Sequence, residues 1–199
     1  MSSNLNETRA RILDAAWKLL EAGQGSGVRM SDIAKTAGIS RQAVYLHFPT
    51  RAELLIAATL YVDEVKNVDA RLFASRTAAT GLERLDAFIE AWGNYIPEVQ
   101  GIAKALIAMQ DTDEAARLAW AGRLKAVRDG CRGAVEALKK DGVLSPEQSV
   151  RQATDILWSM LSVQTWELLT RECGWSQRRY VKTMKELAKK LLVAGPPAG

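Results

Sequence analysis

The sequence predicts an all-α protein, and two observations carry this prediction. No run of residues shows the sustained alternation of apolar and polar side chains that is typical of a half-buried strand. Apolar residues instead recur at intervals of three and four, and in the first segment this stripe comprises Ile12, Ala15, Ala16, Leu19 and Leu20. The chain has 199 residues, of which 48% are hydrophobic, enough to bury a sizeable core. We therefore expect about nine helices, arranged as a small module and a larger body.

Capping residues and helix breakers mark where the predicted helices begin and end. Gly23 is placed to end the first helix, and residues 75–81 form the clearest break in the body. Proline suits the first turn of a helix, where its missing N–H is not needed, and a serine oxygen suits the N-cap. These signals predict helices at residues 51–65 and 113–140, and helix starts at Pro97, at Ser145 with Pro146, and after Ser176.

The basic residues are unevenly distributed along the chain. The net charge is +4, but residues 1–51 hold seven Lys and Arg against four acidic residues, which leaves 20 against 19 in the remainder. A basic head on a nearly neutral body indicates a polyanionic partner that contacts only the head.

Cysteine usage and hydropathy point to the cytoplasm. Cys131 and Cys173 are the only two cysteines, and we expect ordinary thiols rather than a disulfide framework. The chain starts without a basic and apolar secretory leader, and no segment is long and apolar enough to span a membrane. We predict a cytoplasmic protein with no membrane partner.

Residues 29–48 meet several requirements of a helix-turn-helix motif at once. Ala34 is small where two helix backbones must approach, Gly38 tolerates the positive φ of the turn, and Ser40 is a good N-cap for the second helix. The apolar positions that would bury the pair against the first helix are Ile33, Ala37, Ile39, Val44 and Phe48. A simple helical hairpin could share the glycine and the apolar spacing, but it would not need the whole set.

The second helix of the motif presents polar side chains away from this core. Arg41 and Gln42 lie at its N-terminal end, which enters a DNA major groove most deeply, and can pair with guanine and adenine respectively. Tyr45 and His47 can hydrogen-bond to phosphate oxygens, contacts that position a protein on DNA without reading its sequence. The predicted partner is double-stranded operator DNA.

Residues 5–65 closely resemble the DNA-binding domain of the TetR family of repressors. The segments that carry the resemblance are Ile12-Leu-Asp-Ala-Ala16, Asp32-Ile33-Ala34, Ala37-Gly38-Ile39-Ser40 and Tyr45-Leu46-His47-Phe48, followed by the basic Arg51. The resemblance implies that Tyr45, His47 and Arg51 contact the DNA backbone, and that Arg41 reads bases together with its neighbour Gln42.

One position departs from the family pattern. Where this chain has Arg29, the family usually has a threonine that caps the first helix of the motif, and arginine cannot cap in that way. Either Ser31 or a shifted helix start replaces the cap, or Arg29 binds phosphate as a charge. The predicted DNA-contacting residues are Arg29, Ser31, Ser40, Arg41, Gln42, Tyr45, His47 and Arg51.

The resemblance further implies that residues 5–65 bind DNA and that residues 66–195 form a ligand-binding and dimerisation domain. Between residues 156 and 169 apolar side chains fall on every face, with Ile156, Leu157, Met160 and Val163 on one side and Trp158, Leu161, Trp166 and Leu169 on another. A helix that is apolar all round must be covered on both sides, and a second subunit is the simplest cover for one of them. Paired with the last helix, this segment would form the four-helix homodimer interface typical of the family.

Aromatic residues in the body suit a cavity for a small hydrophobic or aromatic effector, which could be flat and apolar or cationic. The predicted ligand-binding residues are Trp92, Tyr95, Trp120 and Trp158. The alternative for each of them is a place in the core or in an interface, where tryptophan is more often found.

Signals for catalysis or a cofactor are weak. Residues 23–27 superficially resemble a glycine-rich phosphate loop, but they follow a helix instead of a strand. His47 is the only histidine, so it cannot anchor a multi-histidine metal site, and Asp111 and Asp113 are typical of a helix start. We predict no enzyme activity, no metal and no cofactor. The favoured function is a repressor released from a palindromic operator by a small-molecule inducer; the alternative is a constitutive repressor without an effector.

Overall fold

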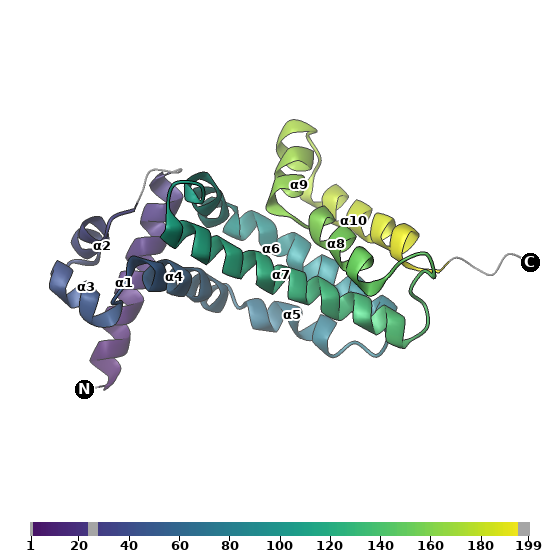
Figure 1. Cartoon of the computed structure of the whole chain (residues 1–199), viewed down its shortest axis with the longest axis horizontal. Coiled ribbons are helices and arrows are strands. Elements are labelled where there is room, and N and C mark those ends of the chain that lie inside the picture. Colours follow the sequence, from purple (N-terminus) through teal and green to yellow (C-terminus); the bar gives the residue numbers. More distant parts are fainter. Residues whose placement is uncertain (1, 24–27, 195–199) are drawn as a thin grey trace, which may run out of the picture. The chain divides into compact units, whose positions relative to one another are not determined.

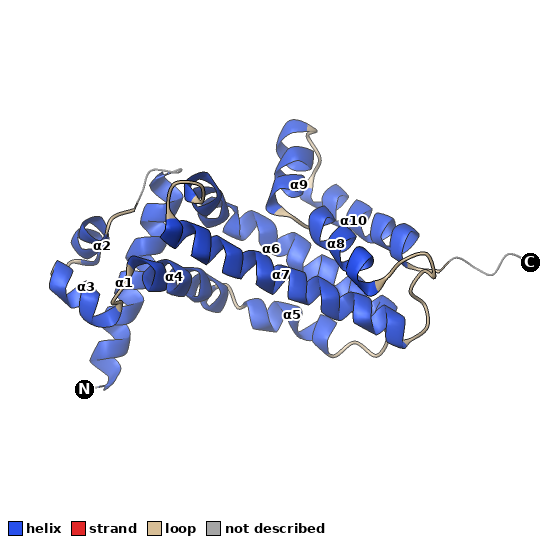
Figure 2. Ribbon diagram, viewed as in Figure 1, coloured by secondary structure: helices blue, strands red, loops and turns tan. Residues whose placement is uncertain are grey.

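The computed structural model describes residues 2–23 and 28–194 of the chain. Within these ranges every regular element is a helix (Figure 2), which confirms the all-α prediction. The elements are α1 (Ser2–Gly23), α2 (Met30–Ala37), α3 (Arg41–His47), α4 (Arg51–Val65), α5 (Val68–Arg76), α6 (Gly81–Met109), α7 (Glu114–Lys140), α8 (Val150–Met160), α9 (Val163–Glu167), the π-helical η1 (Leu168–Glu172) and α10 (Gln177–Leu192). Of the glycine-rich segment 23–27, which resembles a phosphate loop in sequence, residues 24–27 lie outside the described residues.

The chain forms two compact units. The first unit comprises Met1–Asn67 and Val99–Leu124, and the second unit comprises Val68–Glu98 and Lys125–Gly199. The long helices α6 and α7 therefore each contribute one part to the first unit and the other part to the second.

The first unit is organised around α1, which packs on α2 and α4, while α2 packs on α3 (Figure 1). The predicted apolar stripe of α1 supplies this core, because Ile12, Ala16 and Leu20 are fully buried. Leu54 and Leu55 of α4 are also fully buried. The helix α3 is therefore held in place through α2, which in turn packs on α1.

In the second unit α8 packs on α9 and α10, and their buried side chains join those of α6 and α7 in its core. One hydrogen bond ties two of its distant segments together: the indole Nε1 of Trp92 donates to the carbonyl oxygen of Leu161 at 3.0 Å. The last helix starts after Ser176 as predicted, and the Ser176 hydroxyl caps it by accepting from the backbone N–H of Arg179.

Pro97 does not start a helix, as the sequence suggested, but lies inside the continuous α6. Proline has no N–H, so the carbonyl four residues earlier, that of Gly93, lacks its usual helical donor. The Gln177 side chain fills this gap, because its Nε2 donates to the Gly93 carbonyl oxygen at 2.8 Å. A side chain 84 positions from Gly93 thus compensates for the proline, and no local signal could have predicted it.

The predicted helix start at Ser145 and Pro146 is also wrong. The segment around Leu144 instead forms an isolated antiparallel bridge with Val193, and the Ser145 N–H donates to Leu192. The helix α8 begins only at Val150, where Ser149 and Gln152 form a reciprocal capping box.

Residues 156–169 do not form one helix. The helix α8 ends at Met160, the Ser162 hydroxyl caps α9 by accepting from the Thr165 N–H, and η1 follows directly. Leu161 at the break is fully buried in its own subunit. The prediction of one continuous helix over these residues was therefore wrong, and Leu161 is covered by its own chain and does not need a partner.

Candidate nucleic-acid interface

The turn of the motif has the geometry that its residues predict. Gly38 has a φ of 66°, in the left-handed region, and its N–H lies 3.2 Å from the carbonyl oxygen of Lys35. The next N–H, of Ile39, donates to Ala34 at 3.0 Å, so the end of α2 is closed by backbone hydrogen bonds. Ser40 caps α3 as predicted, its hydroxyl accepting from the N–H of Ala43 at 3.1 Å.

Two exposed arginines of α1 support the motif through contacts within the first unit. The guanidinium of Arg9 lies over the ring of the buried Phe48, 4.3 Å from its centroid. Arg11 donates through Nη2 to the carbonyl oxygen of Ala37 at 2.6 Å, which satisfies one end of α2. These cations therefore contribute to the fold of the motif as well as to its charge.

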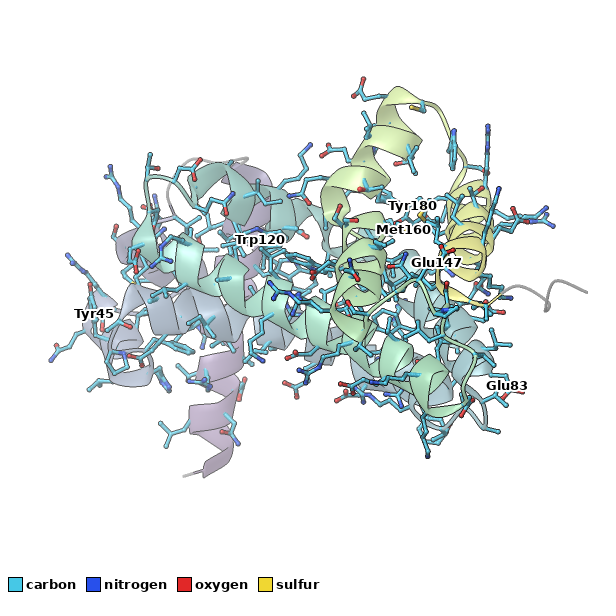
Figure 3. The ribbon with its side chains drawn as sticks, turned by 45° about the vertical axis from the view of Figure 1, so that its right-hand side comes forward. Tyr45, Glu83, Trp120, Glu147, Met160 and Tyr180 are labelled. Atoms are coloured by element: carbon cyan, nitrogen blue, oxygen red, sulfur yellow. The ribbon has the colours of Figure 1, made fainter. Side chains whose placement is uncertain are left out.

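The outer face of α3 is open to solvent. Arg41 and Gln42 are exposed, and Tyr45 stands at the surface of α3 (Figure 3). Arg41 and Tyr45 are coupled one turn apart, since Nη2 of Arg41 donates to the Tyr45 hydroxyl at 3.3 Å. His47 is half-buried at the end of the helix.

Sequence reasoning missed Leu46, whose side chain is 82% exposed on the same helix. A single exposed apolar side chain is common on a protein surface, but this one lies on the helix predicted to enter the major groove, where it could contact a thymine methyl group. The signal was available, because Val44 and Phe48 are the buried positions of α3 and the residue between them must point elsewhere.

Arg29 occupies the N-cap position of α2, and its side chain makes no capping hydrogen bond. The helix starts at Met30, directly after it, so neither a serine cap nor a displaced start replaces the missing threonine. The exposed side chains of Arg29 and Ser31 are instead left on the surface of the first unit.

These residues surround a pocket of about 480 Å³ in the first unit. Three arginines from three elements line it: Arg29 precedes α2, Arg41 begins α3 and Arg51 begins α4. The other lining residues are Val28, Met30, Ser31, Tyr45 and Asp113. Guanidinium groups that line one pocket are suited to bind an oxyanion such as a phosphate.

Asp113 is the unexpected member of this pocket. It lies at the N-terminus of α7, where one carboxylate oxygen accepts from the N–H groups of Ala115 at 3.0 Å and Ala116 at 3.2 Å, as expected for a helix-start residue. Both of its oxygens also accept from Nη1 of Arg51, at 2.6 and 2.5 Å. The two residues are 62 positions apart, so sequence reasoning could not pair them.

The Asp113 carboxyl is held in its ionised form. Burial opposes ionisation, but hydrogen bonds from Arg51 and from two backbone N–H groups of α7, with the positive charge of Arg51, outweigh it. The pKa of Asp113 therefore lies below its ordinary value. At neutral pH the pocket contains a carboxylate among its three cations.

The four aromatic residues predicted to bind a ligand are divided between the two units. Trp92 and Tyr95 belong to the second unit and pack edge to face, with ring centroids 5.6 Å apart. Trp158 belongs to the second unit as well and is half-buried, whereas the buried Trp120 belongs to the first. The guanidinium of Arg71 lies 5.5 Å from the Tyr95 centroid, so this ring already has a cationic neighbour.

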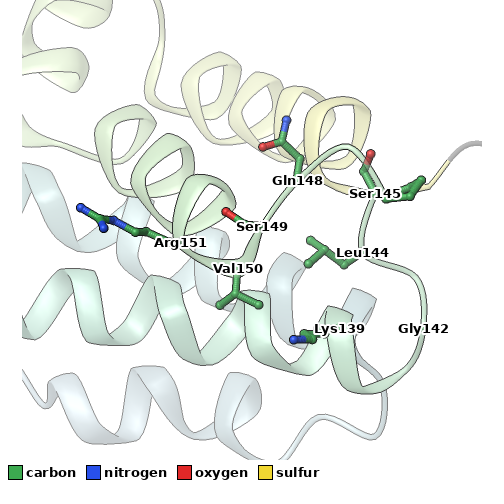
Figure 4. A pocket seen from close by; sticks show the side chains of 9 residues that line it. Lys139, Gly142, Leu144, Ser145, Gln148, Ser149, Val150 and Arg151 are labelled. Carbon is green, nitrogen blue, oxygen red and sulfur yellow. The ribbon is translucent and has the colours of Figure 1, made fainter.

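The second unit has a pocket of its own, of about 490 Å³, between the end of α7 and the start of α8 (Figure 4). Its lining mixes polar side chains, among them Lys139, Gln148 and Arg151, with apolar ones, and includes none of the predicted aromatic residues. The N-terminus of α8 beside it is already satisfied by the capping box of Ser149.

Side chains that could ligate a metal are dispersed over the described part of the chain. Among its residues no group of three or more His, Cys, Asp or Glu side chains could hold a metal ion. No helix in the described ranges is both long and apolar enough to cross a membrane.

A helix-turn-helix with an exposed second helix beside an arginine-lined pocket defines a DNA-binding module. The family model "Bacterial regulatory proteins, tetR family" matches residues 12–58. The HTH-type transcriptional regulator CymR of Pseudomonas putida is 30% identical over 154 residues, 76% of this chain and 73% of the relative. The chain belongs to the TetR family of DNA-binding transcriptional regulators.

Two further similarities differ in extent. The nucleoid occlusion factor SlmA of Marinomonas sp. (strain MWYL1) is 33% identical over 64 residues, and this match spans 32% of each chain. The crystal structure of a transcriptional regulator from Saccharomonospora viridis, solved in complex with choline, superposes with a TM-score of 0.73. It covers 96% of this chain and 100% of that chain at 21% identity, and shows that the two share a fold.

Proposed function

We propose that this protein is a repressor that binds a palindromic operator as a homodimer and is released by a small-molecule effector. The observation that carries the DNA-binding part is the convergence of Arg29, Arg41 and Arg51 on one pocket beside the exposed face of α3. In this proposal α3 enters the major groove, and the pocket receives a backbone phosphate. Such a protein acts on the chromosome, in the cytoplasm.

Each predicted DNA contact has a chemical role in this arrangement. The exposed Arg41 and Gln42 at the start of α3 read base edges. Arg29, Tyr45 and Arg51 around the pocket bind phosphate, with Ser31 and His47 as further backbone contacts. Ser40 contributes by capping α3, which orients the helix that presents the others.

Replacing Arg51 by alanine is expected to weaken binding to every duplex by a similar factor, on the order of five- to tenfold at low salt. A phosphate contact is the same for all sequences, so the preferred sequence should not change. The slope of log K against log salt concentration should also fall by about one. Fluorescence anisotropy with labelled duplexes over a salt series measures both quantities.

The matched control for this experiment is Arg132→Ala. Arg132 is an exposed arginine of α7 in the second unit, so the variant removes the same charge from a residue that does not line the pocket. Equal weakening by both variants would mean that only the total charge matters. A change of preferred base caused by Arg51→Ala would contradict its assignment to the backbone.

The homodimer is proposed to use α8, η1 and α10, of which η1 and α10 expose large apolar side chains. Leu168 is 57% exposed, Leu187 38% and Leu191 45%. Two helices of one subunit with two of its partner would bury these leucines and bring two recognition helices onto the two halves of an inverted repeat.

A glutamate in place of Leu187 is expected to convert the dimer to monomer or aggregate, because it buries an unpaired charge in the interface. Sedimentation velocity measures the outcome. Leu118→Glu is the matched control, since Leu118 is a 40% exposed leucine of the first unit. Dimers that survive Leu187→Glu and Leu191→Glu, but not Leu118→Glu, would place the interface elsewhere. Leu161 is not a useful site for this test, because it is fully buried.

An effector site is proposed in the second unit, around its aromatic residues. The structural neighbour from Saccharomonospora viridis was solved with choline, a cation that aromatic rings bind. In this chain Trp158 is half-buried in the second unit, where Trp92 and Tyr95 are buried, and Trp120 is buried in the first. A ligand at these rings would have to open the packing around them. A ligand found by tryptophan quenching that leaves operator affinity unchanged would favour a constitutive repressor over a ligand-released one.

A further inference from the structure

The Arg51 guanidinium, which the proposed function assigns to an operator phosphate, is already engaged inside the first unit. Its Nε donates to the carbonyl oxygen of Val28 at 2.6 Å, and its Nη1 donates to both oxygens of Asp113. Only 24% of the Arg51 side chain and 20% of the Asp113 side chain are exposed. Two of the three guanidinium nitrogens thus donate to other protein groups in the absence of DNA.

Asp113 is held in this place by more than the arginine. The first backbone N–H groups of α7 bind one of its oxygens, so the carboxylate cannot swing away without uncapping a helix of 27 residues. An anion fixed in a pocket that must accept a second anion opposes its entry, because like charges repel and because both need the same donors.

We infer that Asp113 is an internal competitor for the operator phosphate at Arg51, so that the Arg51–Asp113 ion pair restrains DNA binding. The inference rests on the proposed function and adds a regulatory element to the same site. The phosphate must either displace the carboxylate from Nη1 or share the guanidinium with it against the repulsion of the two anions. Either way, operator affinity depends on where the start of α7 holds Asp113.

A second ion pair, Asp63–Arg123, also joins α4 to α7. Near the other end of α4, Asp63 accepts from Nη2 of Arg123, and both side chains are only 16% exposed. The helix α4 is therefore joined to α7 by one pair at its first residue and another close to its last. The two pairs differ in one respect that a test can use: only Arg51–Asp113 lines the pocket.

Asp113→Asn tests the competition with little change to the helix, because asparagine caps a helix N-terminus about as well as aspartate. We expect the full-length variant to bind DNA roughly three- to tenfold more tightly than the wild type at low salt. The increase should be the same for a random-sequence duplex and for a duplex recovered by in vitro selection, since phosphates do not differ between them. Fluorescence anisotropy measures both affinities.

Asp63→Asn is the matched control. It also removes one carboxylate from an ion pair between α4 and α7, but outside the pocket, so DNA affinity should stay within a factor of two of the wild type (about 0.4 kcal/mol). Thermal melts of each variant check the fold, and Asp113→Ser, which also keeps a capping oxygen, replaces Asp113→Asn if the latter unfolds.

Three results would overturn the inference. Unchanged or weaker binding by Asp113→Asn would show that the carboxylate does not oppose the phosphate. An equal gain from Asp63→Asn would attribute the effect to a loosened α4. A gain confined to the selected duplex would show that Asp113 affects base reading. These outcomes differ from failure of the proposed function, in which the wild type itself shows no preference for a selected duplex over a random one.

Discussion

Replacing Trp92 by alanine is expected to lower the free energy of unfolding by about 3–5 kcal/mol, the usual range for a large aromatic side chain removed from a core. Trp92 is only 8% exposed, packs edge to face on Tyr95 and donates its Nε1 to Leu161 at 3.0 Å. The variant would therefore lose packing and also leave the Leu161 carbonyl without this donor. Urea denaturation followed by circular dichroism measures the change.

Two further variants separate the contributions to this loss. Trp92→Phe keeps an aromatic ring but not the donor, so its cost should be about 1–3 kcal/mol. Trp175→Ala is the control, because Trp175 is only half-buried and packs under the guanidinium of Arg179; its cost should be about 1 kcal/mol. If Trp92→Ala kept full stability but abolished quenching by a ligand, Trp92 would be a binding residue with little part in the core.

Replacing Arg41 or Gln42 by alanine is expected to relax sequence preference at particular base pairs, by about 1–3 kcal/mol for each bidentate pairing with a base that the variant removes. Both side chains are exposed at the N-terminal end of α3. The Arg41 guanidinium lies 5.5 Å from the centroid of the Tyr45 ring. This contact limits the directions in which the Arg41 side chain can reach a base. In vitro selection with each variant, followed by sequencing, measures the preference at every position.

Arg51→Ala is the matched comparison for these two variants, since loss of a backbone phosphate should lower affinity without changing the selected consensus. If Arg41→Ala and Gln42→Ala both returned the wild-type consensus, base reading would have to come from other residues of α3. The exposed Leu46 would then be the next candidate, because an apolar side chain can contact a thymine methyl group.

Local chemistry made most of the first unit predictable. The turn at Gly38, the Ser40 cap, the boundaries of α4 and the buried stripe of α1 follow from interactions between residues a few positions apart. Such interactions depend on helical periodicity and capping, both of which are visible in the order of the residues. The same reasoning failed at Pro97, because the group that replaces its missing hydrogen bond comes from Gln177.

The sequence by itself determined the helical class, the recognition helix and the residues on its outer face. All three follow from an apolar periodicity of 3.6 residues and from capping residues, which are visible along the chain. Only the tertiary structure decided which of the basic residues of the first unit are already engaged by other protein groups. Arg9 and Arg11 contact Phe48 and Ala37 of the motif, and Arg51 is paired with a carboxylate 62 residues away. The reason is that charges interact through space: the partner of an arginine depends on how helices pack, and no local spacing along the chain records it.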